Sequence, residues 1–95
     1  MTDGATIRVQ VPGMLRAGCA GASELLLPAS SVRGALEQIE REHPALYRSI
    51  CDEPGRVRRH VNLFVNTDHI RDLAGVDTAL RPGDILAIMP SVSGG

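Results

Sequence analysis

The sequence predicts one small α+β domain in which a mixed β-sheet is crossed by one main helix. Short segments with alternating apolar and polar residues lie near both ends of the chain, as in strands that bury one face. A longer segment between them has helical periodicity. The 95 residues leave no room for a second core or a second long helix.

The first two predicted strands form a hairpin. Residues 6–11 alternate in polarity, and Pro12 and Gly13 end this strand. Residues 16–23 are rich in Gly and Ala and have no period, so we expect a loop there. Residues 24–27 then predict a short returning strand.

The main helix is expected to begin after Ser30 or Ser31, because serine is a favourable N-cap residue. Its apolar stripe has the i, i+3, i+4, i+7 spacing and comprises Val32, Ala35, Leu36 and Ile39. His43 and Pro44 stop the helix, since the residue before a proline is disfavoured in helical geometry. We expect a partly helical connection over residues 45–51.

The second half of the chain predicts three further strands. Residues 61–65 alternate in polarity, and after a tight turn we expect a short strand at 69–71. Residues 72–80 are irregular. A Pro-Gly-Asp turn precedes the last strand, 85–89, which Pro90 ends.

Composition argues against nucleic-acid and membrane partners. Ten Arg and no Lys stand against eleven acidic residues, giving a net charge of −1 and no overall field for polyanions. One Phe, one Tyr and no Trp offer few platforms for base stacking. No apolar run is long enough to span a bilayer, and residues 1–5 lack a secretory signal pattern, so we expect a cytoplasmic protein.

Side chains give no signature of catalysis. His43, His60 and His69 lack the spacing of metal ligands, so we expect no metal site. Cys19 and Cys51 match no redox or metal motif and are expected to be reduced thiols. No nucleophile elbow or phosphate-binding glycine loop is present. We therefore expect no catalytic residues in this chain.

A local basic cluster comprises Arg56, Arg58, Arg59 and His60. One interpretation is a solvated approach to the following strand. The other is a docking patch for an acidic partner surface.

The end of the chain offers one reactive group. We expect a domain over residues 1–90 and a flexible tail over 91–95, composed of Ser91, Val92, Ser93, Gly94 and Gly95. The two glycines lack a Cβ, so the tail can thread a channel too narrow for side chains. The Gly95 carboxylate becomes electrophilic only as an acyl-adenylate, which another protein's pocket must produce.

Strand alternation predicts a docking face near this tail. If Leu86 and Ile88 face the core, then Ala87 and Met89 face outward, and Phe64 does so on its own strand. We predict that Phe64, Ala87 and Met89 form an apolar partner-binding patch. Met89, six residues before the end, is the strongest single candidate for contact.

This order of elements, running into a terminal Gly-Gly, resembles the β-grasp, ubiquitin-like fold and the MoaD/ThiS family of sulfur carrier proteins. The resemblance lies in the first strand, the main helix and the segments 61–66, 81–85 and 90–95. Within the family the sequence is most similar to carriers that supply cysteine biosynthesis, because of the long 45–60 connection and the Asp-His-Ile-Arg run at 68–71.

The resemblance implies a carrier that is not itself an enzyme and binds no cofactor. An ATP-dependent, E1-like adenylyltransferase and sulfurtransferase would convert the Gly95 carboxylate to a thiocarboxylate, with residues 91–94 threading partner channels. In the cysteine branch, a pyridoxal-phosphate-dependent synthase would receive the sulfur and a zinc peptidase would release the product. In the molybdopterin branch, the tail would enter the large subunit of a synthase.

Two other functions stay open at this point. The chain could be a protein modifier conjugated through Gly95 to lysines of target proteins. It could also be a β-grasp binding module, for example for RNA, with an incidental tail. Neutral charge and few aromatic residues weaken the second alternative.

Overall fold

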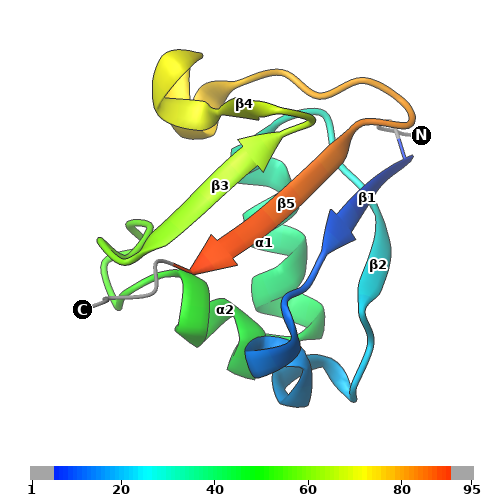
Figure 1. The fold of residues 1–95 in the computed structure, drawn as a ribbon, viewed down its shortest axis with the longest axis vertical. Coiled ribbons are helices and arrows are strands. Elements are labelled where there is room, and N and C mark those ends of the chain that lie inside the picture. Colours follow the sequence, from blue (N-terminus) through cyan, green and yellow to red (C-terminus); the bar gives the residue numbers. More distant parts are fainter. Residues whose placement is uncertain (1–5, 91–95) are drawn as a thin grey trace.

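Residues 6–90, which the computed structural model describes, form a mixed five-stranded sheet with α1 and α2 packed on one face (Figure 1). The predicted α+β class is confirmed. The strands and α-helices are β1 (Thr6–Gln10), β2 (Glu24–Pro28), α1 (Val32–Glu42), α2 (Pro44–Ile50), β3 (Val61–Val65), β4 (Asp68–His69) and β5 (Ile85–Pro90).

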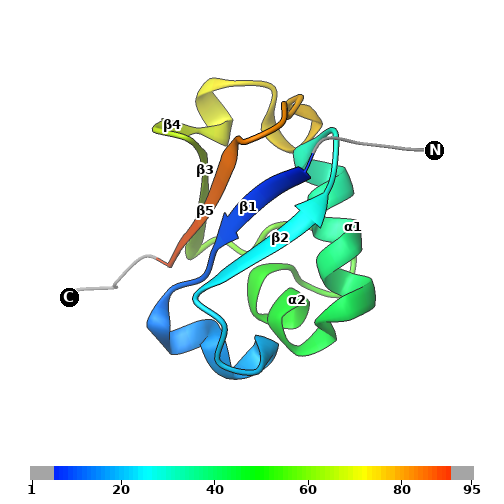
Figure 2. The same ribbon diagram turned by 90° about the vertical axis from the view of Figure 1, so that its right-hand side faces the viewer.

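The last strand lies at the centre of the sheet. The strand order is β2-β1-β5-β3-β4, with β5 parallel to β1 and antiparallel to β3. β1 and β2 form the predicted antiparallel hairpin. Seen from the side in Figure 2, α1 and α2 lie together on one side of the strands. First and last strands paired in parallel, with a helix crossing behind them, make this a β-grasp fold, as the resemblance implied.

The main helix begins and ends as the sequence predicts. Ser31 is the N-cap of α1, and its Oγ accepts a hydrogen bond of 3.0 Å from the Gly34 backbone N–H. The predicted apolar stripe is buried against the sheet. α1 ends at Glu42, and Pro44 begins α2 in a new direction, because proline is tolerated in a first helical turn.

The expected loop at 16–23 is wrong in its first part. Gly13–Cys19 forms a 3₁₀ helix, η1, that packs against α2. A Cβ added to Gly18 would lie 2.8 Å from the Leu46 backbone nitrogen, so this contact requires glycine. Close packing between the η1 and α2 backbones therefore explains the glycine at position 18.

The strand expected at 69–71 is shorter and begins earlier. β4 consists of Asp68–His69, and the chain then turns into a 3₁₀ helix, η2 (Ile70–Asp72), followed by a second one, η3 (Gly75–Asp77). The imidazole Nδ1 of His69 accepts a 3.0 Å hydrogen bond from the Arg71 N–H and so caps η2. This local bond competes with continued strand pairing.

The β3–β4 turn also fixes the start of β5. Asn66 adopts a φ of 58°, a left-handed conformation that asparagine tolerates. Its side-chain Oδ1 accepts from the Ile85 N–H at 3.2 Å, and its Nδ2 donates to an Asp84 carboxylate oxygen at 3.3 Å. One side chain thus joins two turns that are distant in sequence.

Candidate functional site

The candidate site lies at the end of the central strand. β5 is held on one side by β1, through residues 85–87, and on the other by the whole length of β3. Its last residue, Pro90, pairs with Val61. The predicted tail, residues 91–95, lies outside the described residues. The described part of the site is therefore the rigid base from which the sequence continues to Gly95.

The two faces of β5 alternate as predicted. Leu86 and Ile88 are buried in the core, whereas Met89 on the opposite face is 53% exposed. Ala87 shares the outer face but is only 9% exposed, since it sits on the central strand directly beside Phe64 of β3 and Gln10 of β1. Of the predicted patch, Met89 therefore supplies most of the apolar surface that a partner could reach.

Phe64 lies on the outer face, as predicted, and is half-buried. Its ring packs edge-on against the His69 imidazole, with the ring centroids 5.0 Å apart. Since His69 Nδ1 accepts from Arg71, Nε2 carries the proton and donates to the Asn62 Oδ1 at 3.0 Å. These contacts fix the orientation of the aromatic edge of the patch.

Sequence reasoning missed a hollow beside Met89. It has a volume of about 410 Å³ and lies where β1 stops pairing with β5. Arg16 of η1 forms part of its wall, and the Nε of this arginine donates to the Val11 carbonyl at 3.1 Å. The sequence of η1 did not predict this wall, because a 3₁₀ helix produces no amphipathic stripe of the usual α-helical spacing. The hollow offers a place for a partner side chain next to Met89.

Neither thiol is exposed as a nucleophile. Cys19 and Cys51 are free and buried, as predicted for reduced structural thiols. The Cys19 thiol is 3.4 Å from the Ala22 carbonyl oxygen, to which it donates. Burial raises the pKa of the Cys51 thiol, outweighing a hydrogen bond with Tyr47 that lowers it. The Cys51 thiol therefore stays protonated and unreactive at neutral pH.

The described residues contain no group of three or more side chains placed to hold a metal ion. No helix in this part of the chain is long and apolar enough to cross a membrane.

The predicted basic cluster belongs to a larger feature. Arg56, Arg58 and Arg59 line a cleft of about 630 Å³, whereas His60 does not. Arg33 of α1 and Arg71 of η2 line the same cleft, although they are distant in sequence. No local pattern could have predicted that these two arginines join the cluster.

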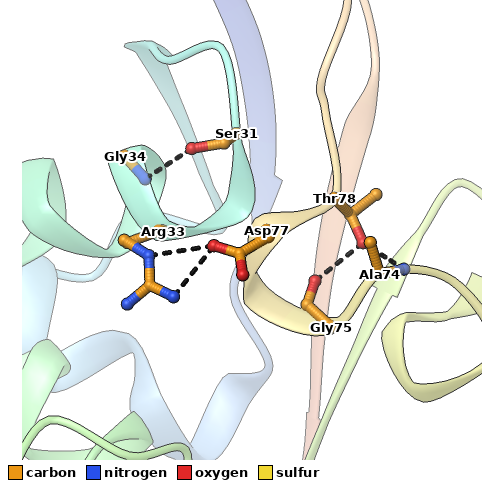
Figure 3. Close-up of polar contacts among 7 residues, drawn as sticks. All are labelled: Ser31, Arg33, Gly34, Ala74, Gly75, Asp77 and Thr78. Carbon is orange, nitrogen blue, oxygen red and sulfur yellow. Dashed lines mark hydrogen bonds and ion pairs between the residues drawn. The ribbon is translucent and has the colours of Figure 1, made fainter.

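A contact between two elements fixes one wall of the cleft (Figure 3). The Arg33 Nε and Nη2 donate to one Asp77 carboxylate oxygen at 3.1 and 2.9 Å. The Thr78 hydroxyl closes η3 by donating to the Gly75 carbonyl at 2.7 Å and accepting from the Ala74 N–H. The start of α1 is thereby held against η3.

A β-grasp sheet with this strand order, β5 at its centre and parallel to β1, defines the class of ubiquitin-like proteins. The described surface exposes Met89 at the end of β5, beside a hollow of about 410 Å³. Within that class, the chain belongs to the ThiS family of sulfur carriers, whose family profile matches residues 9–95.

Individual relatives agree with this assignment. The chain is 28% identical over 91 residues to the sulfur carrier protein CysO of Mycobacterium tuberculosis, covering 94% of this chain and 98% of that protein. It is similar in structure to a chain of the Amycolatopsis orientalis BexX/CysO complex, with a TM-score of 0.85, 26% identity and coverage of 94% and 99%. It also resembles small archaeal modifier protein 1 of Methanosarcina acetivorans, with a TM-score of 0.86, 30% identity and coverage of 98% and 99%.

Proposed function

We propose that this protein carries sulfur as a thiocarboxylate on its last residue, Gly95. One observation carries the proposal: a ThiS-family chain ends in Gly-Gly five residues after the central strand of its sheet. Five extended residues reach roughly 17 Å beyond Pro90, enough to place a terminal carboxylate inside another protein while the domain stays outside.

The proposed chemistry has two steps. A carboxylate oxygen of Gly95 attacks the α-phosphorus of ATP on an E1-like activating enzyme, and pyrophosphate leaves. Hydrosulfide then attacks the acyl carbon, AMP leaves, and a proton is released as the thiocarboxylate forms. Glycine suits both steps, because neither backbone angles nor a side chain obstruct approach to the carbonyl.

The described surface supports this role because it offers an apolar site at which a partner protein can bind. Met89 is exposed close to the point where β5 gives way to the tail, with the adjacent hollow beside it. Exposed apolar side chains next to a concave surface are typical of interfaces. We propose that the activating enzyme docks on Met89 and Phe64 while the tail, residues 91–95, enters its active site.

Cysteine biosynthesis is the proposed destination of the sulfur. The similarity to CysO over nearly the full length of both chains supports this branch over the molybdopterin branch. The partners would then be a pyridoxal-phosphate-dependent synthase and a zinc peptidase. We propose a cytoplasmic location, where ATP is available to the activating enzyme. ATP and pyridoxal phosphate would be bound by these partners.

Intact-mass spectrometry after incubation with the activating enzyme, ATP and sulfide tests the proposal. We expect a mass gain equal to the exchange of one oxygen for one sulfur. A chain with an amidated Gly95 is the matched control, because it keeps every residue and removes only the reacting carboxylate. ATP-dependent sulfur gain by the amidated chain would contradict the proposal.

Conjugation to target proteins is a second candidate, favoured by the structural similarity to small archaeal modifier protein 1. Both functions begin with adenylation, so the first product does not separate them. With Ser93→Arg placing an arginine directly before Gly94, tryptic digestion of whole-cell protein would leave this chain's Gly-Gly remnant on target lysines only if conjugation occurs. Since the sequence contains no Lys, chains of this protein on its own side chains are excluded.

A further inference from the structure

The arginine cleft is lined by five guanidinium side chains from separate parts of the chain. It lies along the edge of β3, between the start of α1, the loop before β3, and η2 and η3. The arginines are Arg33, Arg56, Arg58, Arg59 and Arg71. Among the described residues, no Asp or Glu lines the cleft. The whole chain has a net charge of −1, so this excess of positive charge is confined to the cleft and its surroundings.

Only part of this positive charge is balanced. Arg33 pairs with Asp77, and the Nε of Arg56 lies 3.6 Å from an Asp52 carboxylate oxygen. Between residues 6 and 90, no ion pair forms at Arg58, Arg59 or Arg71. The Nε of Arg58 donates to the Arg48 carbonyl at 2.8 Å, which anchors that side chain without neutralising it. The cleft therefore retains positive charge suited to carboxylates or phosphates.

The floor of the cleft is apolar. It is lined by Val57, Val61, Leu63, Ile70 and Val76, which lie in or against the hydrophobic core. A free inorganic anion would use the arginines and leave this floor in contact with water. Neither Phe64 nor Tyr47 lines the cleft, and the one imidazole that does, His69, is already packed against Phe64, so bases have little stacking surface there. A ligand with both acidic and apolar side chains matches the lining better than an inorganic anion or a nucleic acid does.

The cleft also borders an uncovered part of the sheet. β4 pairs with Phe64 and Val65 alone. Residues 61–63 pair with β5 on one side; on the other side no strand within the described residues pairs with Val61 or Leu63, although the Val61 N–H donates to the Arg58 carbonyl at 3.0 Å. These three residues extend for about 10 Å, which is the length of a short peptide strand. Extended peptides commonly bind along such edges, with side chains in adjacent pockets.

We propose that the arginine cleft binds an extended segment of a partner protein in which acidic residues alternate with aliphatic ones. The acidic side chains contact Arg58, Arg59 and Arg71, and the aliphatic side chains cover the apolar floor. This surface lies across β3 from β5, so a partner can hold it while Met89 and the tail are engaged elsewhere. The inference does not depend on sulfur transfer.

The probe is a short synthetic peptide in which aspartate alternates with valine, titrated into the ¹⁵N-labelled full chain. We expect the largest shifts at the amides of Val57, Leu63 and Val76. Replacing aspartate by asparagine in the peptide keeps its shape and removes its charge, and should abolish binding. An aspartate peptide that causes no shifts at these amides would overturn the proposal.

Paired charge-removal variants locate the site. Arg59→Gln with Arg71→Gln should weaken peptide binding by about tenfold, because charged contacts at a desolvated site carry much of the affinity. Arg41→Gln with Arg81→Gln removes the same charge outside the cleft and should change affinity by less than about twofold. Equal losses in both pairs would show non-specific attraction and contradict the proposal. All four substituted side chains are exposed and outside the core, so both pairs should fold.

Competing ligands are tested with the same labelled chain. Inorganic phosphate, ATP and a single-stranded RNA oligonucleotide are each added in place of the peptide. Weaker binding of all three supports a protein partner. Tighter binding of any of them, lost in the Arg59→Gln and Arg71→Gln pair, would overturn the proposal in favour of that ligand.

Discussion

The two faces of β5 differ in what their side chains do. On the inner face, Leu86 and Ile88 are buried at the centre of the core beneath the helices. On the outer face, Met89 is exposed although the strand itself is central. A central strand normally carries its hydrophobic residues for stability. Here a single step along the strand changes a side chain from core to surface, so stability and partner binding can be altered separately.

The largest expected effect comes from the inner face. Leu86→Ala should lower the free energy of unfolding by about 2–5 kcal/mol, through lost burial and the cavity left behind. Met89→Ala should change it by less than about 0.5 kcal/mol, since that side chain is mostly in water. Urea unfolding followed by circular dichroism measures both values. Similar losses in the two variants would mean that the outer face is part of the core.

Met89→Asp tests partner binding at the outer face without disturbing the core. It should fold normally yet lower kcat/KM for adenylation by the activating enzyme about tenfold, equivalent to about 1.4 kcal/mol, because it places a charge in an apolar contact. Leu26→Asp is the matched control. Leu26 is 65% exposed on the same face of the sheet, but on β2, two strands from β5.

Adenylation of the Leu26→Asp variant should fall by less than about twofold. Equal impairment of the Met89→Asp and Leu26→Asp variants would show that the partner does not distinguish the end of β5 from the rest of the outer face.

The smallest effect concerns a titratable group on the helix-covered side. Burial raises the pKa of the Cys51 thiol, so between its unfolded and folded pKa values the native state binds more protons than the unfolded state. The stability from this thiol is therefore present below its ordinary value of 9.0 and is lost as the pH rises above it. The slope is at most about 1.4 kcal/mol per pH unit for one proton.

Urea midpoints measured from pH 7 to above pH 10 test this dependence. Cys51→Ala should flatten the alkaline loss of stability, although Tyr47, whose pKa burial also raises, contributes some of it. Met89→Ala should retain the full loss. An unchanged alkaline slope in the Cys51→Ala variant would contradict the assignment.

Local patterns predicted most of the fold. Period-two alternation located the longer strands, and serine capping with helical spacing located α1 to within a residue. The errors fell at η1 and η2, where structure depends on contacts between elements. Gly18 packs against the Leu46 backbone, and His69 caps the turn that follows it. Neither contact produces a periodic signal.

The candidate site was predictable in a similar way. Alternation assigned Met89, Phe64 and Ala87 to the outer face, but the near-burial of Ala87 depends on its neighbours across the sheet. The local cluster of Arg56, Arg58, Arg59 and His60 was visible in the sequence, but His60 does not line the cleft. Arg33 and Arg71 join it only through the tertiary fold. The role of Gly95 rests on the sequence and on family membership.

The location of the sulfur tests the central claim most directly. After loading with the activating enzyme, ATP and sulfide, the intact chain is fragmented in the mass spectrometer and the modified fragment is identified. The account predicts one oxygen replaced by one sulfur in fragments that contain the Gly95 carbonyl, with both cysteines unchanged. Sulfur found only in fragments that lack the Gly95 carbonyl, or no sulfur gain at all, would contradict it.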